Sequence, residues 1–161
     1  WQRDLSVSYE KVGDVLMAQG NLPEALKSFR DGLAIRDRLA RTDPGNAGWQ
    51  RDLSVSYDRV GGVLEAQGNL PEALKSFRDG LAIADRLARA DPGNADWQRA
   101  LAVSHAHLAE VYRRSNDPGN ALAALRQGQS VMKQVVKLSP DNAGWKNDLD
   151  WFNDQIAALT K

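Results

Sequence analysis

The chain has 161 residues, and its 21 basic and 21 acidic side chains leave no formal net charge, whereas nucleic-acid surfaces carry a surplus of lysine and arginine. It contains no cysteine, which excludes disulfides and thiolate metal sites. No apolar run approaches the ~18 residues of a membrane helix, and no signal-peptide pattern opens the chain. These features favour one domain or a short repeat array with neither a membrane nor a nucleic-acid partner.

The first predicted element is a helix from about Trp1 to Ala18. Its apolar residues recur every three or four positions, which is the period of one helix face: Trp1, Leu5, Tyr9, Val12 and Leu16. Gly13 lies on the same face, where we expect the missing side chain to let a partner helix approach closely.

A turn and a second helix follow. Gly20 favours a left-handed helix end, Asn21 and Glu24 have the spacing of a capping box, and Pro23 suits a first helical turn. These residues predict a helix of about 30 Å from Leu22 to Thr42, folded back on the first. Its apolar face contains Leu22, Ala25, Leu26, Phe29, Leu33 and Leu39, with Gly32 as a second close contact.

Tryptophan shows the period of a repeat. Trp1, Trp49, Trp97 and Trp145 are each 48 residues apart, and residues 1–48 and 49–96 differ at only seven positions. We therefore predict a single array over 1–161, made of repeats 1–48, 49–96 and 97–144 and a capping helix at 145–161. The polar face of that last helix, with Asp148, Asp150, Asn153 and Asp154, suits the end of an array.

Turn clusters separate the repeats, and they predict Asn46, Asn94 and Asn142 as N-caps of the helices that follow. The third repeat diverges. Asn116 replaces the turn glycine and tolerates the left-handed region, while the Asp117–Asn120 segment predicts a looser turn. His105 replaces the tyrosine of the apolar face, so we interpret it as a core residue rather than a metal ligand.

This pattern resembles the tetratricopeptide repeat family. The matching residues of the first repeat recur 48 positions later and in part in the third repeat; they are Tyr9, Val12, Gly13, Leu16, Gly20, Leu22, Ala25, Phe29, Gly32 and Ile35. The resemblance implies an all-α fold of tandem antiparallel hairpins, an α-solenoid with a right-handed superhelix, and seven helices including the cap. The family's usual repeat has ~34 residues, so we expect longer helices here.

The resemblance also implies a peptide-binding groove lined by the first helix of each repeat. Helical spacing places the lining residues in one line on each first helix. The predicted groove residues are Arg3, Val7, Glu10, Asp14, Met17, Arg51, Val55, Asp58, Glu65, Arg99, Val103, Glu110 and Arg113. The alternative is a solvated face without a partner.

The family's carboxylate clamp needs a cation where this chain has Glu10, Asp58 and Ala106. The resemblance therefore implies a basic or mixed-charge segment rather than an acidic C-terminal peptide.

We thus predict a protein-interaction scaffold without catalysis, cofactor or metal. The alternative is a structural module that stacks end to end or acts as a spacer, because a chain starting at Trp1 leaves one apolar face of its first helix unpaired. Catalytic residues are not evident: the acidic residues recur with the repeat, and His105 and His107 point apart on a helix. Near-identical tandem copies are typical of amplified bacterial arrays, and we expect a cytoplasmic protein.

Overall fold

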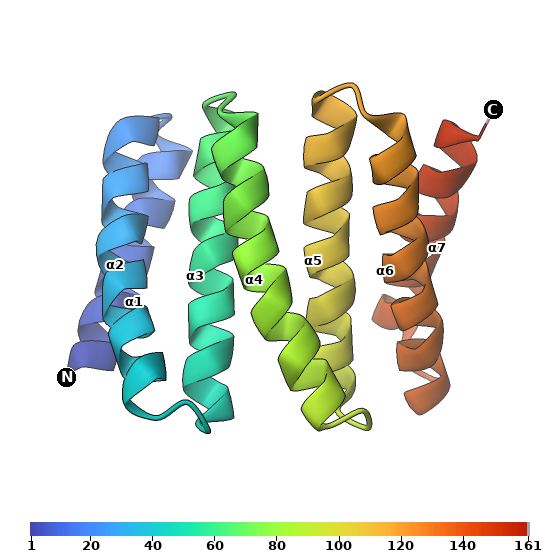
Figure 1. The fold of residues 1–161 in the computed structure, drawn as a ribbon, viewed down its shortest axis with the longest axis horizontal. Helices are drawn as coiled ribbons and strands as arrows, with labels where there is room; N and C mark the ends of the chain where they lie inside the picture. Colours follow the sequence, from blue (N-terminus) through green and yellow to red (C-terminus); the bar gives the residue numbers. More distant parts are fainter. Residues whose placement is uncertain (161) are drawn as a thin grey trace. The chain divides into compact units, whose positions relative to one another are not determined.

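The computed structural model describes residues 1–160, and every element in that range is a helix (Figure 1). These are α1 (Gln2–Ala18), α2 (Leu22–Thr42), α3 (Ala47–Ala66), α4 (Leu70–Ala90), α5 (Ala95–Arg114), α6 (Pro118–Leu138) and α7 (Ala143–Leu159). The all-α class and the seven predicted helices are confirmed within the described residues. The predicted end of the capping helix at residue 161 lies outside them.

The chain divides into two compact units, with the boundary inside α4 after Ile83. In the first unit, α2 packs against α1 on one side and against α3 on the other (Figure 1). In the second unit, α6 packs in the same way between α5 and α7. Each unit therefore contains a helical hairpin and the first helix of the next repeat.

The turns within the hairpins share one backbone conformation. Gly20 and Gly68 have φ values of 74° and 78°, and Asn116 has a φ of 57°. In the first turn the N–H of Asn21 donates to Leu16 O at 2.9 Å, and in the third the N–H of Asp117 donates to Tyr112 O at the same distance. The prediction of a looser third turn is therefore wrong, because asparagine adopts the left-handed conformation that the turn requires.

The helix caps confirm one prediction and correct another. Asn46, Asn94 and Asn142 each accept a backbone N–H three residues on, at 3.1 Å. Asn21 also occupies an N-cap position, but its side chain makes no capping hydrogen bond, so the predicted capping box is wrong. Pro23 removes one of the two N–H groups that an N-cap side chain normally binds, and the ψ of Asn21 is 73°, outside the extended range.

Glycines bring the helices of each hairpin together. A Cβ added to Gly13 would lie 2.7 Å from the ring of Phe29, and one on Gly61 would lie 2.7 Å from the ring of Phe77. A Cβ on Gly32 would lie 3.3 Å from the carbonyl oxygen of Ser6. The predicted close contacts are confirmed, and each aromatic ring occupies the space that the glycine leaves.

The apolar face of the first helices is covered only where a preceding helix packs on it. On α3, against α2, Val63 is fully buried, whereas Val15 at the same place on α1 is 56% exposed and Trp1 is 95% exposed. Leu5 and Val12 on α1 are also exposed. This matches the expectation of an unpaired apolar face on the first helix.

Buried polar side chains join the helices at places that the sequence pattern did not reveal. Ser28 Oγ on α2 donates to Tyr9 O on α1 at 2.7 Å. Gln50 Nε2 donates to Ala40 O at 3.2 Å, which satisfies a carbonyl at the C-terminal end of α2. Such bonds keep buried backbone carbonyls paired and fix the offset between neighbouring helices.

Candidate functional site

On each first helix the predicted groove residues lie along one side, and we call this side the first-helix face. In the first unit the face carries Arg3, Val7, Glu10, Asp14 and Met17 on α1, and Arg51, Val55, Asp58 and Glu65 on α3. In the second unit it carries Arg99, Val103, Glu110 and Arg113 on α5. Whether these residues contact a partner stays a prediction.

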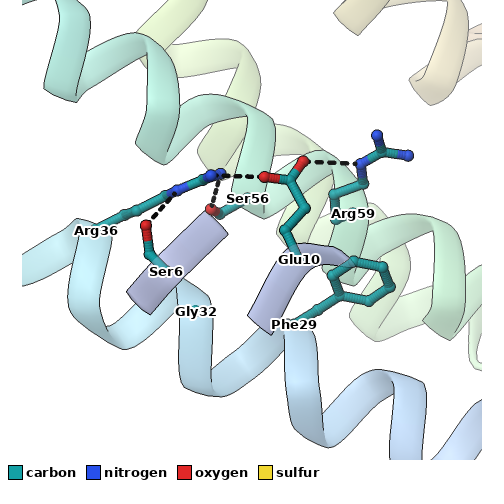
Figure 2. A pocket seen from close by; sticks show the side chains of 7 residues that line it. All are labelled: Ser6, Glu10, Phe29, Gly32, Arg36, Ser56 and Arg59. Atoms are coloured by element: carbon teal, nitrogen blue, oxygen red, sulfur yellow. Dashed lines mark hydrogen bonds and ion pairs between the residues drawn. The ribbon is translucent and has the colours of Figure 1, made fainter. Parts of the chain in front are cut away.

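The side chain of Arg36 occupies the site on the first-helix face of the first unit. This arginine comes from α2, is only 5% exposed, and reaches between α1 and α3 (Figure 2). Its Nη2 lies 2.5 Å from Glu10 Oε2. Its Nε donates to Ser6 Oγ at 3.2 Å, and its Nη1 donates to Ser56 Oγ at 3.0 Å. The remaining cavity is about 10 Å³, so the site is closed.

A second arginine pairs with two acidic side chains of this face. Arg59 Nε lies 3.4 Å from Glu10 Oε1, and Arg59 Nη1 lies 3.6 Å from Asp14 Oδ1. Arg3 Nε pairs with Asp52 Oδ2 at 2.9 Å. The sequence analysis placed Glu10 and Asp14 in the predicted groove and left Arg59 out. The structure instead shows a surface of paired, mixed charge.

The second unit has an open pocket in the corresponding place. A cavity of about 270 Å³ lies between α5, α6 and α7, and we call it the α5–α7 pocket. It is lined by Val103, Ala106, Met132, Asp148, Trp151 and Phe152. Met132 and Phe152 are buried, whereas Trp151 is 44% exposed. The lining is therefore mainly apolar, with one exposed aromatic wall.

Three replacements at equivalent repeat positions explain why the first site is closed and the second is open. Met132 stands where the first unit has Arg36, Ala106 stands where it has Glu10, and Phe152 replaces Ser56. None of these replacements can form an ion pair, so the side chains that close the first site are absent from the second.

Sequence analysis gave α7 a polar face with Asp148, Asp150, Asn153 and Asp154 but did not place Trp151, which is 44% exposed. Trp151 lies 48 residues after Val103, itself a predicted groove residue. The repeat register could therefore have placed Trp151 on the first-helix face.

Two ion pairs lie on the first-helix face of the second unit, and one of them includes Asp148 of the pocket lining. Arg99 Nε pairs with Asp148 Oδ2 at 2.6 Å, and Arg113 pairs with Glu110 at 2.6 Å. The hydrogen bond from Arg113 lowers the pKa of Glu110, and burial offsets part of that effect. Both groups are partly exposed, so these pairs orient the side chains more than they stabilise the fold.

Sites for chemistry are not evident among the described residues. Within 1–160, no group of three or more His, Asp or Glu side chains is placed to hold a metal ion. No helix in the same range is long and apolar enough to span a membrane. His105 is half-buried, and burial lowers its pKa while Asp85 raises it in part. Its Nδ1 is buried without a hydrogen-bond partner.

Antiparallel hairpins that recur along the sequence, each joined to the first helix of the next, define a helical-repeat protein. A model of the tetratricopeptide repeat family matches residues 6–40. Residues 54–88 repeat the matched segment with only five differences.

Solved structures support the fold alone. The N-terminal domain of stress-induced protein-1 from C. elegans is similar with a TM-score of 0.61 at 13% identity, over 99% of this chain and 98% of that chain. A de novo designed helical repeat protein is similar with a TM-score of 0.52 at 12% identity, over 99% of this chain and 94% of that chain. No curated protein matches the chain.

Proposed function

We propose that this chain is a non-catalytic interaction scaffold that binds a peptide or protein segment on its first-helix face. The observation that carries this proposal is the α5–α7 pocket, a preformed hollow of about 270 Å³ with Trp151 exposed in its wall. A lining held on rigid helices lowers the entropic cost of binding. Exposed aromatic side chains are enriched at the centres of protein interfaces.

The charges of the first unit favour a ligand of basic or mixed charge. Arg3, Glu10 and Asp14 all lie on its first-helix face, and both signs are represented. Glu10 occupies a position where capture of a C-terminal carboxylate would need a cation. An acidic C-terminal peptide is therefore not the ligand that this surface favours.

Selection from a phage-displayed library of random peptides tests the proposal. We expect the immobilised chain to enrich a family of related peptides. Two variants remove parts of the face: one replaces Arg51, Val55 and Asp58 together by alanine, and the other replaces Val103 and Trp151 together by alanine. Each should recover those peptides at least about tenfold less, which corresponds to a loss of about 1.4 kcal/mol of binding free energy. Circular dichroism should show unchanged helicity.

A matched control changes the opposite side of the first unit. Replacing Lys27, Arg30 and Asp31 by alanine alters three solvent-facing residues of α2 whose ion pairs are exposed. This variant should recover the same peptides as the parent. Recovery of no peptide family by the parent, or loss of recovery only in the α2 variant, would contradict the proposal.

The alternative function is end-to-end assembly, and the exposed apolar face of α1 favours it. Leu53, Val60 and Val63 are buried on α3, whereas the same positions on α1 are exposed. Under this alternative, sedimentation velocity should show association that grows with concentration. A chain that stays monomeric over the whole range would exclude this function for these residues.

A further inference from the structure

We propose that the α5–α7 pocket receives one bulky apolar side chain of the bound segment, and that the residue next to it is basic. The proposal rests on the proposed function, because it names the ligand of the same face. The proposal is argued from an apolar pocket that lies beside the exposed Trp151, with Asp154 one turn further along α7.

The size of the pocket selects a single side chain. Its volume of about 270 Å³ lies just below the roughly 300–1,000 Å³ of sites that enclose a whole small molecule. Met132 and Phe152 are buried and close the floor, and Val103 and Ala106 line the α5 side. An aromatic or large aliphatic side chain would replace water against these surfaces and be stabilised by the hydrophobic effect.

The first unit provides an internal comparison. There Arg36 occupies the equivalent hollow, and its ion pair with Glu10 leaves only about 10 Å³. In the second unit Met132 and Ala106 replace those two residues and leave the hollow open. The same fold therefore carries one site closed by its own side chains and one that a ligand side chain can fill.

The charges at the rim favour a basic neighbour. Arg99 already neutralises Asp148 at 2.6 Å. Asp154 follows Trp151 by three residues, so both side chains lie on the same side of α7, and Asp154 is exposed and forms no ion pair within residues 1–160. A lysine or arginine of the ligand would meet the Asp154 carboxylate and the face of the Trp151 ring together.

The test repeats the library selection with the pocket filled from within. Ala106→Phe adds a ring at the pocket wall, and Val103→Phe does so from a second position in case the first variant folds poorly. Ala157→Phe, at an exposed position of α7 outside the pocket lining, is the matched control. We expect the parent and the control to enrich peptides with Phe, Trp, Leu or Met beside Lys or Arg. Both filled variants should recover these peptides at least tenfold less.

A spectroscopic measurement locates the contact. In a ¹H–¹⁵N spectrum each of the five tryptophans gives one indole N–H signal, and Trp151→Phe assigns the signal of Trp151. Adding the most enriched peptide should shift that signal, and the same peptide with alanine in place of its apolar residue should not.

The outcomes separate this proposal from the function on which it rests. Equal recovery by the parent and both filled variants would overturn the pocket proposal and leave the scaffold function intact. Enriched peptides with an acidic residue beside the apolar one would overturn the assignment of a basic neighbour. Recovery of no peptide family by the parent would contradict both proposals.

Discussion

A single residue from the second helix decides the character of each site on the first-helix face. Arg36 and Met132 occupy the same repeat position, two repeats apart. Arg36 closes its site, whereas Met132 leaves its site open. The sequence reveals that this position varies. It does not reveal that Arg36 points between α1 and α3, because that depends on how the three helices pack.

The buried ion pair of Arg36 gives the first prediction. Glu10→Ala removes the carboxylate and leaves a buried guanidinium with neutral partners only, so we expect it to lower the free energy of unfolding by about 3 kcal/mol. Arg36→Met places an apolar side chain of similar length in the same space and leaves Glu10 paired with Arg59, so it should cost less than Glu10→Ala. Urea unfolding of both variants measures the difference, and equal losses would contradict this interpretation.

Two adjacent glycines give the second prediction. A Cβ on Gly61 would clash with the Phe77 ring at 2.7 Å, whereas a Cβ on Gly62 meets nothing within 4 Å. Gly61→Leu should therefore cost about 1–3 kcal/mol through overpacking. Gly62→Leu should be stabilising by roughly 0.5 kcal/mol because leucine favours the helix. If Gly61→Leu unfolded at the same urea concentration as the parent, the placement of Gly61 would be wrong.

His105 gives a prediction about pH. Burial lowers its pKa in the folded state, so the unfolded chain binds more protons between that lowered value and the ordinary pKa near 6.5. Stability should therefore fall as pH decreases through and below about 6.5. His105→Tyr, which restores the residue of the first two repeats, should remove this part of the pH dependence. Identical slopes for parent and variant in urea unfolding between about pH 5 and 8 would refute the assignment.

At the scale of the helices, the sequence predicted most of the fold. The bounds of α2 agree with prediction because turn residues and a proline mark its start and a DPGN turn follows its end. The third turn was mispredicted because composition suggested a loose loop, whereas Asn116 supplies the backbone conformation that the hairpin requires. The polar bonds of Ser28 and Gln50 were not predictable, since each depends on the offset between neighbouring helices.

The caps give a matched pair of variants. Asn46 accepts the backbone N–H of Trp49 at 3.1 Å, so Asn46→Ala should lower stability by about 1 kcal/mol. Asn21 occupies the same kind of position without a capping hydrogen bond, and Asn21→Ala should change stability by less than about 0.5 kcal/mol. Thermal and urea unfolding compare the two, and an equal loss in both would show that the side-chain bond of Asn46 contributes nothing.

At the scale of the whole molecule, the repeat period predicted the architecture but not the site. The lining of the first-helix face was predictable for α1, α3 and α5, because those helices share one register. The α5–α7 pocket was not, because its wall comes from Trp151 on a helix interpreted only as a cap. Near-identical repeats thus share a scaffold, and the third repeat with its capping helix carries the feature that differs.

The footprint of a selected peptide tests the central claim most directly. Backbone ¹H–¹⁵N spectra of the chain, recorded while an enriched peptide is added, report which residues change their surroundings. We expect the largest shifts on the first-helix face, at positions such as Val55, Val103, Ala106 and Trp151. Shifts confined to the solvent-facing sides of α2 and α6, for example at Lys27 and Arg126, would contradict a scaffold that binds through its first helices.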